Sequence, residues 1–271
     1  MRRSVWFWLA TAIILTVIVL PVVWIYLTSF KPPEDIWSLG VRRLFIFRPT
    51  LENYGYLFEL TDFFAEIRNT VIVAVASTAL VMAVSLPAAY SFARWNTGGG
   101  MLLFVTISTR MFPAVVAAIP FFFWFRAMGL LDTHIGLTLL LFYFNMSFAT
   151  FLLFGFFREI PRELEDAAMV DGYGRFEIFR RIIFPLIKPG ASITAVFCLI
   201  WAWNEFLFSF LFTRAAAKTV SVGISLFWAA MNIQWGPMAA CVGLAIIPTL
   251  IAAWFMQRYI VRGLTFGAIK G

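Results

Sequence analysis

Charged side chains are scarce in this chain. Only 13% of its 271 residues are charged, 62% are hydrophobic, and the mean hydropathy is +0.89. Soluble domains carry roughly 25% charged residues, so this composition excludes an ordinary soluble protein. It predicts an all-α, polytopic membrane protein.

Cysteine and histidine are nearly absent as well. The chain has two cysteines, Cys198 and Cys241, and one histidine, His134. The cysteines lie inside apolar segments without a CxxC pattern, which argues against a disulfide framework or a metal site. A GxxxxGK[ST] phosphate loop is also missing from the sequence, so we expect this chain to bind no cofactor of its own.

The net charge of +7 raises the question of a nucleic-acid partner. The basic residues, however, cluster at the ends of apolar runs rather than on one amphipathic face. This pattern is typical of membrane topology. We therefore expect contact with membrane lipid and no nucleic-acid partner.

Six apolar runs are long enough to cross a bilayer, which takes about 20 residues of helix. The runs are Val5–Ser29, Thr70–Phe92, Met101–Trp124, Ile135–Phe157, Ala191–Phe212 and Met238–Tyr259. Arg2 and Arg3 precede the first run, and no small-residue cleavage site follows it. We therefore expect a retained first helix rather than a cleaved signal peptide. The sequence predicts one transmembrane domain over residues 1–271 with both termini on the same side.

Arginine and lysine are distributed unevenly between the two sides. If the termini are inside, twelve basic residues lie inside and seven outside. The inner set is Arg2, Arg3, Arg94, Arg158, Arg162, Arg175, Arg180, Arg181, Lys188, Arg258, Arg262 and Lys270, and the outer set is Lys31, Arg42, Arg43, Arg48, Arg68, Arg214 and Lys218. This bias predicts cytoplasmic termini and a cytoplasmic segment 158–190.

A long segment, residues 30–69, follows the first run. It is too polar to span the membrane and too short for an independent domain. Two interpretations stay open: a structured external cap that touches an extracytoplasmic partner, or a simple connector.

Segment 158–190, which we call the charged loop, stands between two long apolar runs. Such charge cannot lie in hydrocarbon and must sit at the membrane surface. Pro161 suits the first turn of a helix. The acidic residues that follow favour the positive N-terminal end of that helix; they are Glu163, Glu165 and Asp166.

Small residues come next in the charged loop. Ala167 and Ala168 allow another surface to come close, and Gly172 is well placed to end the helix. Asp171 lies at the wrong end for the helix dipole, so a turn bond or a partner contact explains it better. The loop is interpreted either as an exposed helix that docks a soluble partner or as an ordinary amphipathic surface helix.

The order Glu165-Asp166-Ala167-Ala168-x-x-Asp171-Gly172, with Ile183-Phe184-Pro185 downstream, resembles the EAA loop of ABC importer permeases. That family usually has Glu where Asp166 stands. Its loop forms the coupling helix that seats in a cleft of a cytosolic ATPase. The resemblance implies that the ATPase's closing motion reaches the membrane helices through Glu165, Asp166, Ala167, Ala168, Asp171 and Gly172.

Further segments are similar to the carbohydrate-uptake members of the same family. They are residues 69–94, 110–113 with 119–120, 129–137, 203–206 and the tail 262–271. Together they resemble the second, six-helix permease of a sugar or polyol importer of type I architecture. The resemblance implies transport-core helices within 70–259, a coupling loop at 158–190 and a cytoplasmic tail, 263–271, that reaches the ATPase dimer.

The same resemblance implies a location and a set of partners. The chain would reside in the bacterial inner membrane with a second permease, two ATPase subunits and an extracytoplasmic solute-binding protein. It would translocate its solute by alternating access and would not itself be an enzyme. ATP and Mg would be used by the partner ATPase.

Polar residues within the predicted spans are candidates for a solute pathway, because a charge at a helix centre costs about 2.5–3.5 kcal/mol on insertion scales. Carboxylate and amide groups can bond sugar hydroxyls, and an aromatic face can stack on a pyranose. The candidates are Trp203, Asn204, Glu205, Asn145 and Arg110. An interhelical bond is the alternative for Glu205, and snorkelling or a helix–helix pair is the alternative for Arg110.

Two other functions fit the sequence less well. An ion-driven secondary transporter would carry internal repeats and acidic residues in several spans, whereas Glu205 stands almost alone. An intramembrane enzyme would need a Ser/His or a two-carboxylate arrangement in the spans, which the sequence lacks.

Overall fold

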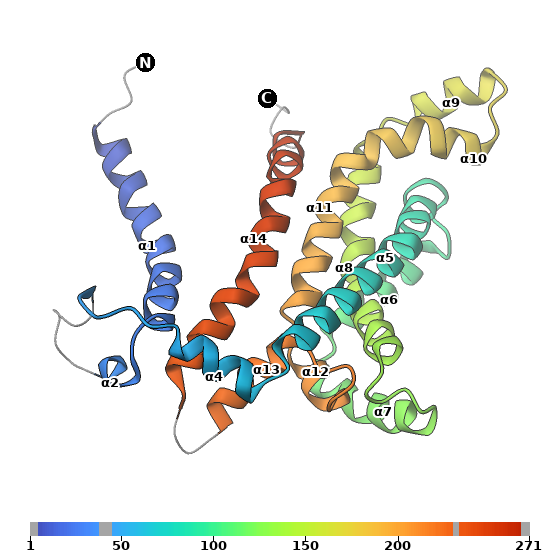
Figure 1. Ribbon diagram of the computed structural model, residues 1–271. Helices are drawn as coiled ribbons and strands as arrows, with labels where there is room; N and C mark the ends of the chain where they lie inside the picture. The colour runs from blue at the N-terminus through green and yellow to red at the C-terminus, as the bar shows by residue number, and fades with distance from the viewer. Residues whose placement is uncertain (1–4, 38–44, 230–232, 267–271) are drawn as a thin grey trace. The chain divides into compact units, whose positions relative to one another are not determined.

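The chain is described by a computed structural model for residues 5–37, 45–229 and 233–266, and every regular element in these ranges is helical (Figure 1). The elements are α1 (Val5–Ser29), α2 (Pro33–Ile36), α4 (Glu52–Leu60), α5 (Phe63–Trp95), α6 (Gly99–Ser108), the 3₁₀ turn η1 (Thr109–Met111), α7 (Ala114–Ala127), α8 (His134–Glu159), α9 (Glu163–Val170), α10 (Arg175–Ile178), the π-helical segment η2 (Phe179–Ile183), α11 (Phe184–Trp203), α12 (Leu207–Phe212), α13 (Val220–Ala229) and α14 (Trp235–Phe266).

Two compact units divide the chain. Unit 1 comprises residues 1–67 and 220–248, and unit 2 comprises residues 68–219 and 249–271. The long helices α5 and α14 contribute residues to both units. The charged loop and all the predicted pathway residues belong to unit 2.

In unit 1, the segment after α1 is packed rather than loose. The buried Asn53 of α4 donates from Nδ2 to the carbonyl oxygens of Ser29 (2.9 Å) and Lys31 (2.7 Å). Leu57, one turn later, is fully buried in an apolar cluster with α13 and α14 residues. Of the two interpretations of residues 30–69, the structure supports an ordered cap for the residues it describes.

Among the described residues, five helices are long and apolar enough to span a membrane, and α6–η1 with α7 makes a sixth candidate that is bent by 94°. The predicted span Met101–Trp124 falls on this bent pair, so it is not one straight helix. Pro113 explains the bend, because it lacks an N–H and disfavours helical backbone at the preceding residue. Phe112 accordingly has an extended conformation (φ −71°, ψ 129°).

The fifth span also differs from its prediction, Ala191–Phe212. Helix α11 begins earlier, at Phe184, and ends at Trp203, and the separate helix α12 follows. A second short helix of the charged loop, α10, continues through η2 into α11. Pro185 has no N–H to donate to the carbonyl four residues earlier. The backbone hydrogen bonds therefore change there from the α-helical to the π-helical pattern, and Phe184 N donates to Phe179 O, five residues earlier.

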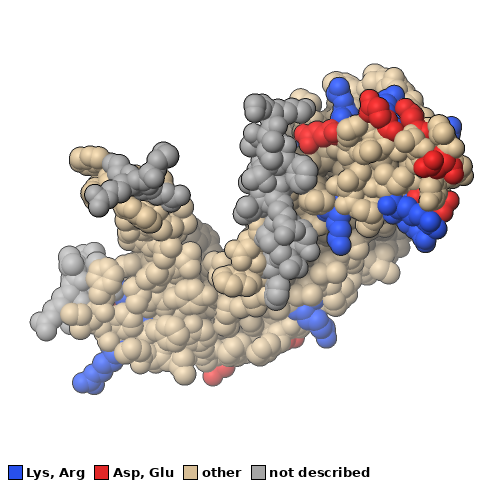
Figure 2. Space-filling model, turned by 90° about the horizontal axis from the view of Figure 1, so that it is seen from above, with Lys and Arg blue, Asp and Glu red and all other residues tan. Residues whose placement is uncertain are grey.

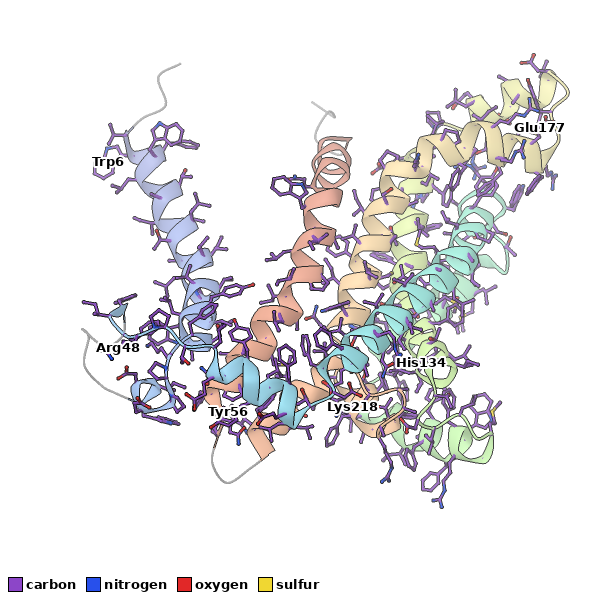
Figure 3. The ribbon with its side chains drawn as sticks, in the orientation of Figure 1. Trp6, Arg48, Tyr56, His134, Glu177 and Lys218 are labelled. Atoms are coloured by element: carbon purple, nitrogen blue, oxygen red, sulfur yellow. The ribbon has the colours of Figure 1, made fainter. Side chains whose placement is uncertain are left out.

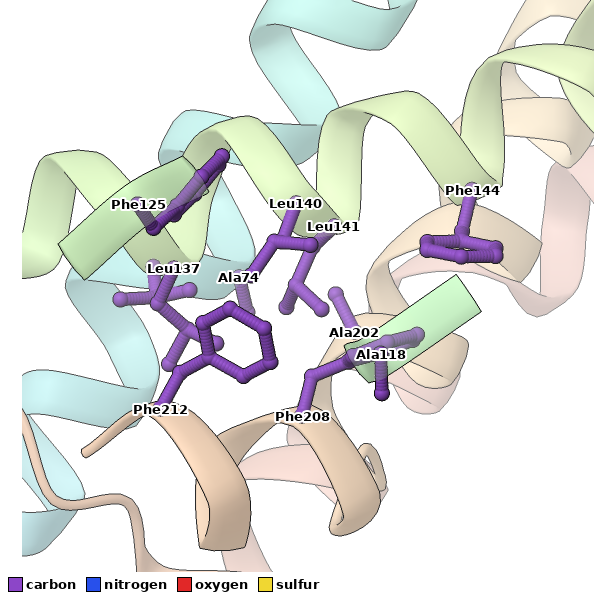
Figure 4. Packing of buried hydrophobic residues seen from close by; sticks show 11 residues of the cluster. Ala74, Ala118, Phe125, Leu137, Leu140, Leu141, Phe144, Ala202, Phe208 and Phe212 are labelled. Atoms are coloured by element: carbon purple, nitrogen blue, oxygen red, sulfur yellow. The ribbon is translucent and has the colours of Figure 1, made fainter. Parts of the chain in front are cut away.

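Buried aromatic and aliphatic side chains join α8 to α5, α7, α11 and α12 inside unit 2 (Figure 4). Phe144 stacks on Phe208 with ring centroids 4.5 Å apart. Helix α8 supplies Leu137, Leu140 and Leu141 to the same cluster. Helix α8 is thus the central support of the unit.

The loop after α12 is held by Asp132, which precedes α8. The Asp132 carboxylate accepts the N–H groups of Arg214, Ala215, Ala216 and Ala217 at 2.9–3.2 Å. Nearby, His134 Nε2 lies 2.8 Å from Asn69 Oδ1, and Asn69 donates to the carbonyls of residues 216 and 218. His134 and Lys218 mark this end of unit 2 in Figure 3, and Glu177 marks the other.

Protonation of Asp132 should release this loop. Partial burial opposes the charged form, but the four backbone N–H bonds prevail and lower the pKa of Asp132. The stability that the Asp132 carboxylate contributes is therefore fully present above its unfolded pKa of about 3.9. It is lost as the pH falls through the lower pKa of the folded state. We expect amide protection at residues 214–217 to persist to pH 5 and to disappear only in stronger acid, as hydrogen exchange would measure.

The matched variant is Asp132→Asn, whose single side-chain oxygen cannot accept four bonds. Since a bond to a charged acceptor contributes about 1.5–3 kcal/mol, protection at residues 214–217 should fall about tenfold or more at neutral pH. Amides in the middle of α8 serve as the internal control. Unchanged protection at 214–217 would contradict the role given to Asp132.

Candidate functional site

The charged loop forms the short helix α9, a turn, and then α10, which leads into α11 (Figure 1). Helix α9 ends at Val170, and Gly172 adopts the left-handed conformation, with φ +85°. Tyr173 N bonds Ala168 O at 3.0 Å, and Gly172 N bonds Met169 O at 3.1 Å. The prediction that Gly172 ends this helix is confirmed, because a side chain would be strained at that φ.

Glu165 points inward from α9 and is 8% exposed. Its Oε2 accepts the Tyr90 hydroxyl at 2.7 Å, and its Oε1 pairs with the Nε of Arg94. Arg94 also donates from Nη1 to Phe157 O and from Nη2 to Ile160 O, both at 3.0 Å. We call this arrangement the Glu165 clasp; it joins α9 to the ends of α5 and α8.

Ala168 lies one turn after Glu165 on the same side of α9. It packs in an apolar cluster that includes Ala89 of α5, Leu153 and Phe157 of α8, and Ile187 of α11. Of the two interpretations of the loop, the burial of Glu165 and Ala168 fits a helix with one buried and one exposed side. Both residues are buried against their own chain because their side of the helix faces this cluster.

The opposite side of α9 is exposed. Asp166, Ala167, Asp171 and Gly172 are exposed. They adjoin uncovered apolar side chains, among which Val170 is 87% and Phe176 is 78% exposed. Figure 2 shows acidic and basic side chains gathered at the end of unit 2 that carries α9 and α10. An exposed apolar tip with charged flanks suits contact with another protein.

The acidic residue of the predicted pathway serves as a helix cap. Glu205 follows α11, and its carboxylate accepts Phe208 N (2.8 Å), Ser209 N (3.0 Å) and the Ser209 hydroxyl (3.2 Å). These are the amides that the start of α12 would otherwise leave unpaired. The carboxylate thus supports the break between α11 and α12.

Two of the other pathway candidates lie at the end of α11. Asn204 is exposed and donates to Ile200 O of its own helix at 2.8 Å. Trp203 is half-buried and packs against the aromatic cluster of unit 2.

The remaining candidates connect helices. Asn145 is fully buried and donates to Cys198 O at 3.2 Å, from α8 to α11. Arg110 donates to Phe144 O at 3.0 Å and lies over the Trp201 ring at 5.0 Å. These contacts agree with the alternative given above for Arg110, in which its side chain pairs one helix with another. Trp203, Asn204 and Glu205 are adjacent at the α11–α12 break, whereas Asn145 and Arg110 lie elsewhere along α8 and η1.

Sequence reasoning missed the partners of Glu165. Arg94 entered only as a basic residue marking the inner side, and Tyr90 only as part of a family segment. Their spacing of four residues places both on one face of α5, and this is a readable signal. Nothing local to either residue, however, indicates a carboxylate 71 to 75 positions later in the chain.

The fold and site together define a multi-pass helical membrane protein that presents a short, firmly anchored helix at one end. The sequence matches the family described as "binding-protein-dependent transport system inner membrane component" over residues 82–266, and the chain belongs to that family. It is therefore a permease of the ABC importer class, a non-catalytic translocation subunit whose ATPase is a partner. An ion-driven secondary transporter has no support.

Several relatives align over nearly the whole chain. A probable ABC transporter permease of Sinorhizobium fredii, y4oR, is 36% identical across 99% of this chain and 96% of its own length. The trehalose transport system permease SugB of Mycobacterium tuberculosis is 33% identical across 100% of this chain and 99% of its own length. The trehalose/maltose transport system permease MalG of Thermococcus litoralis is 35% identical across 96% of this chain and 95% of its own length.

Solved structures show the same fold. A chain of a bacterial ABC transporter involved in the import of the acidic polysaccharide alginate aligns with a TM-score of 0.77 at 22% identity, covering 96% of this chain and 98% of that one. A chain of the MetNI methionine ABC transporter aligns with a TM-score of 0.57 at 16% identity, covering 78% of this chain and 98% of that one.

The capping role of Glu205 leads to a stability prediction. Glu205→Ala leaves two buried amides of α12 without acceptors, so the free energy of unfolding should fall by about 1–2 kcal/mol. Glu205→Gln keeps one acceptor oxygen and should lose less. Thermal unfolding of the purified protein in detergent measures both, with Asn204→Ala, which alters the exposed neighbour, as the control. If Glu205→Ala unfolds like Asn204→Ala, the cap is not stabilising.

Proposed function

We propose that this chain is one of two permease subunits in an ATP-driven importer of a sugar, polyol or sugar derivative. The relatives that span the whole chain support this solute class, because their names specify trehalose, trehalose/maltose and sulfoquinovosyl glycerol. The complex would contain a second permease, two ATPase subunits and an extracytoplasmic solute-binding protein. ATP and Mg would be bound by the ATPases.

The observation that carries this proposal is the two-sided character of α9. One side is buried against α5, α8 and α11, and the other exposes an apolar tip beside acidic residues. A helix of this kind can receive a push from a docked protein and pass it to the membrane helices. Asp166, Ala167, Asp171 and Gly172, with Val170, would form the docking side.

The orientation of the chain in the membrane belongs to the same proposal. The excess of basic residues on one side supports cytoplasmic termini in a bacterial inner membrane. With that orientation, the charged loop, 158–190, would lie within reach of the ATPases. The tail 263–271 would extend toward the same partners. Helix α14 continues to Phe266, and residues 267–271 lie outside the described part of the chain.

Transport would proceed by alternating access. A loaded receptor docks outside, the ATPases close on ATP, and α9 moves with them so that the paired permeases open outward. Hydrolysis then restores the inward-open state. Within this chain, Trp203 and Asn204 at the end of α11 would meet the solute, and Glu205, Asn145 and Arg110 would shape the helices around it.

The docking side of α9 can be tested by charge reversal. In the double variant Val170→Arg, Asp171→Arg, two arginines replace an apolar contact and an acid at the exposed tip. We expect about tenfold or greater loss of ATPase co-purification, which corresponds to about 1.4 kcal/mol. Receptor-stimulated ATP hydrolysis should fall in parallel, and the yield of the membrane-inserted permease should not change.

Glu159→Arg provides the matched control, because Glu159 is an exposed acid at the end of α8, outside α9. This variant should retain the ATPase. Full retention and full stimulation in the double variant would refute the docking role of α9.

A further inference from the structure

Glu165 lies in the helix expected to dock the ATPase, yet its bonds go to its own chain. Both carboxylate oxygens are engaged, by Tyr90 and by Arg94. The side chains of Arg94 and Glu165 are 5% and 11% exposed, respectively. A carboxylate in this position has no free face for a partner protein.

All three guanidinium nitrogens of Arg94 donate hydrogen bonds at this site. Its Nε, Nη1 and Nη2 reach Glu165, Phe157 O and Ile160 O. The two carbonyls belong to the last turn of α8 and the residue after it, where a helix leaves acceptors unpaired. One side chain on α5 therefore bonds both the end of α8 and the start of α9.

Helix α9 is only eight residues long, and a helix of that length is not stable alone in water. Its position therefore depends on what holds its inner side. Ala168 packs in the buried cluster that also holds residues of α5, α8, α10, η2 and α11. The polar contacts of this side are the Glu165 clasp and a bond from Arg162 Nη2, just before α9, to Ala93 O at 3.1 Å, and they lead to the ends of α5 and α8.

We propose that Glu165 and Arg94 are positioning residues that make α9 move as one body with the ends of α5 and α8, and that Glu165 does not contact the ATPase. The inference rests on the proposed function, and it divides the loop into two sides with different tasks. Asp166, Val170 and Asp171 bind the ATPase, and Glu165 transmits its motion. Without the clasp, the motion of the ATPase would deform the loop instead of moving the helices.

Substitutions on the inner and outer sides of α9 should therefore have different effects on transport. Glu165→Gln leaves the Arg94 cation buried without its anion, and it leaves the outer side of α9 unchanged. We expect the ATPase to stay bound and to hydrolyse ATP, while the solute imported per ATP hydrolysed falls about fivefold or more, the lower end of typical coupling strengths. The assay is uptake and hydrolysis by the whole complex in lipid vesicles, with its receptor.

Glu163→Gln is the control, because Glu163 is an exposed acid in the first turn of the same helix. It should leave the import ratio unchanged. Tyr90→Phe removes one bond but keeps the ion pair, and it should give an intermediate ratio in a protein that still assembles. The swap Arg94→Glu with Glu165→Arg should not restore coupling, because a glutamate at 94 cannot donate to the carbonyls of α8.

Hydrogen exchange on the permease alone gives a second measurement. Amides of α9 should exchange faster in Glu165→Gln than in the unaltered protein, and those in the middle of α8 should not. An unchanged import ratio, or loss of the ATPase from Glu165→Gln with unchanged α9 exchange, would overturn the proposal. If the unaltered complex contains no ATPase, the proposed function fails, and the exchange result still decides whether the clasp holds α9.

Discussion

The buried carboxylate of Glu165, between Arg94 and Tyr90, holds the short helix α9 against the ends of α5 and α8. Isolated charges are expensive to bury, so Glu165 and Arg94 are tolerated inside only because each satisfies the other and the remaining donors of Arg94 find carbonyl oxygens. The helix that bears Glu165 is too short to stand alone. Its orientation, and with it the exposure of Val170 and Asp171, follows from this pair.

Charged side chains also pair with backbone groups at three places where the chain of unit 2 leaves its helices. A helix end leaves backbone groups without partners inside the helix, and side chains can supply those partners. Glu205 supplies acceptors at the start of α12, Asp132 supplies them for residues 214–217, and Arg94 supplies donors at the end of α8. In a chain with only 13% charged residues, several of the few charges serve this purpose.

Two prolines mark places where the helices depart from simple spans. Pro113 separates α6–η1 from α7, and Pro185 widens the ladder into the π-helical segment between α10 and α11. Both positions are visible in the sequence. The size of the bend and the choice between a kink and a π turn depend on the neighbouring helices. At the Pro113 bend, the hydroxyls of Thr109 and Ser147 bond each other and Arg110 donates to Phe144 O, which ties η1 to α8.

Hydropathy was sufficient to place α1 at Val5–Ser29 and to locate α5, α8 and α14, because burial in lipid acts on every residue of a long run. The order of charges, alanines and glycine was sufficient to identify the charged loop, its helix end at Gly172 and its family resemblance. The direction of each side chain in that loop came only from the tertiary structure. An eight-residue helix with mixed composition has no clear periodicity, and the partners of Glu165 lie 71 and 75 residues away in the chain. For the same reason, only the fold showed that Ala168 faces inward and that Glu205 caps a helix: their contacts are set by which segments meet in space.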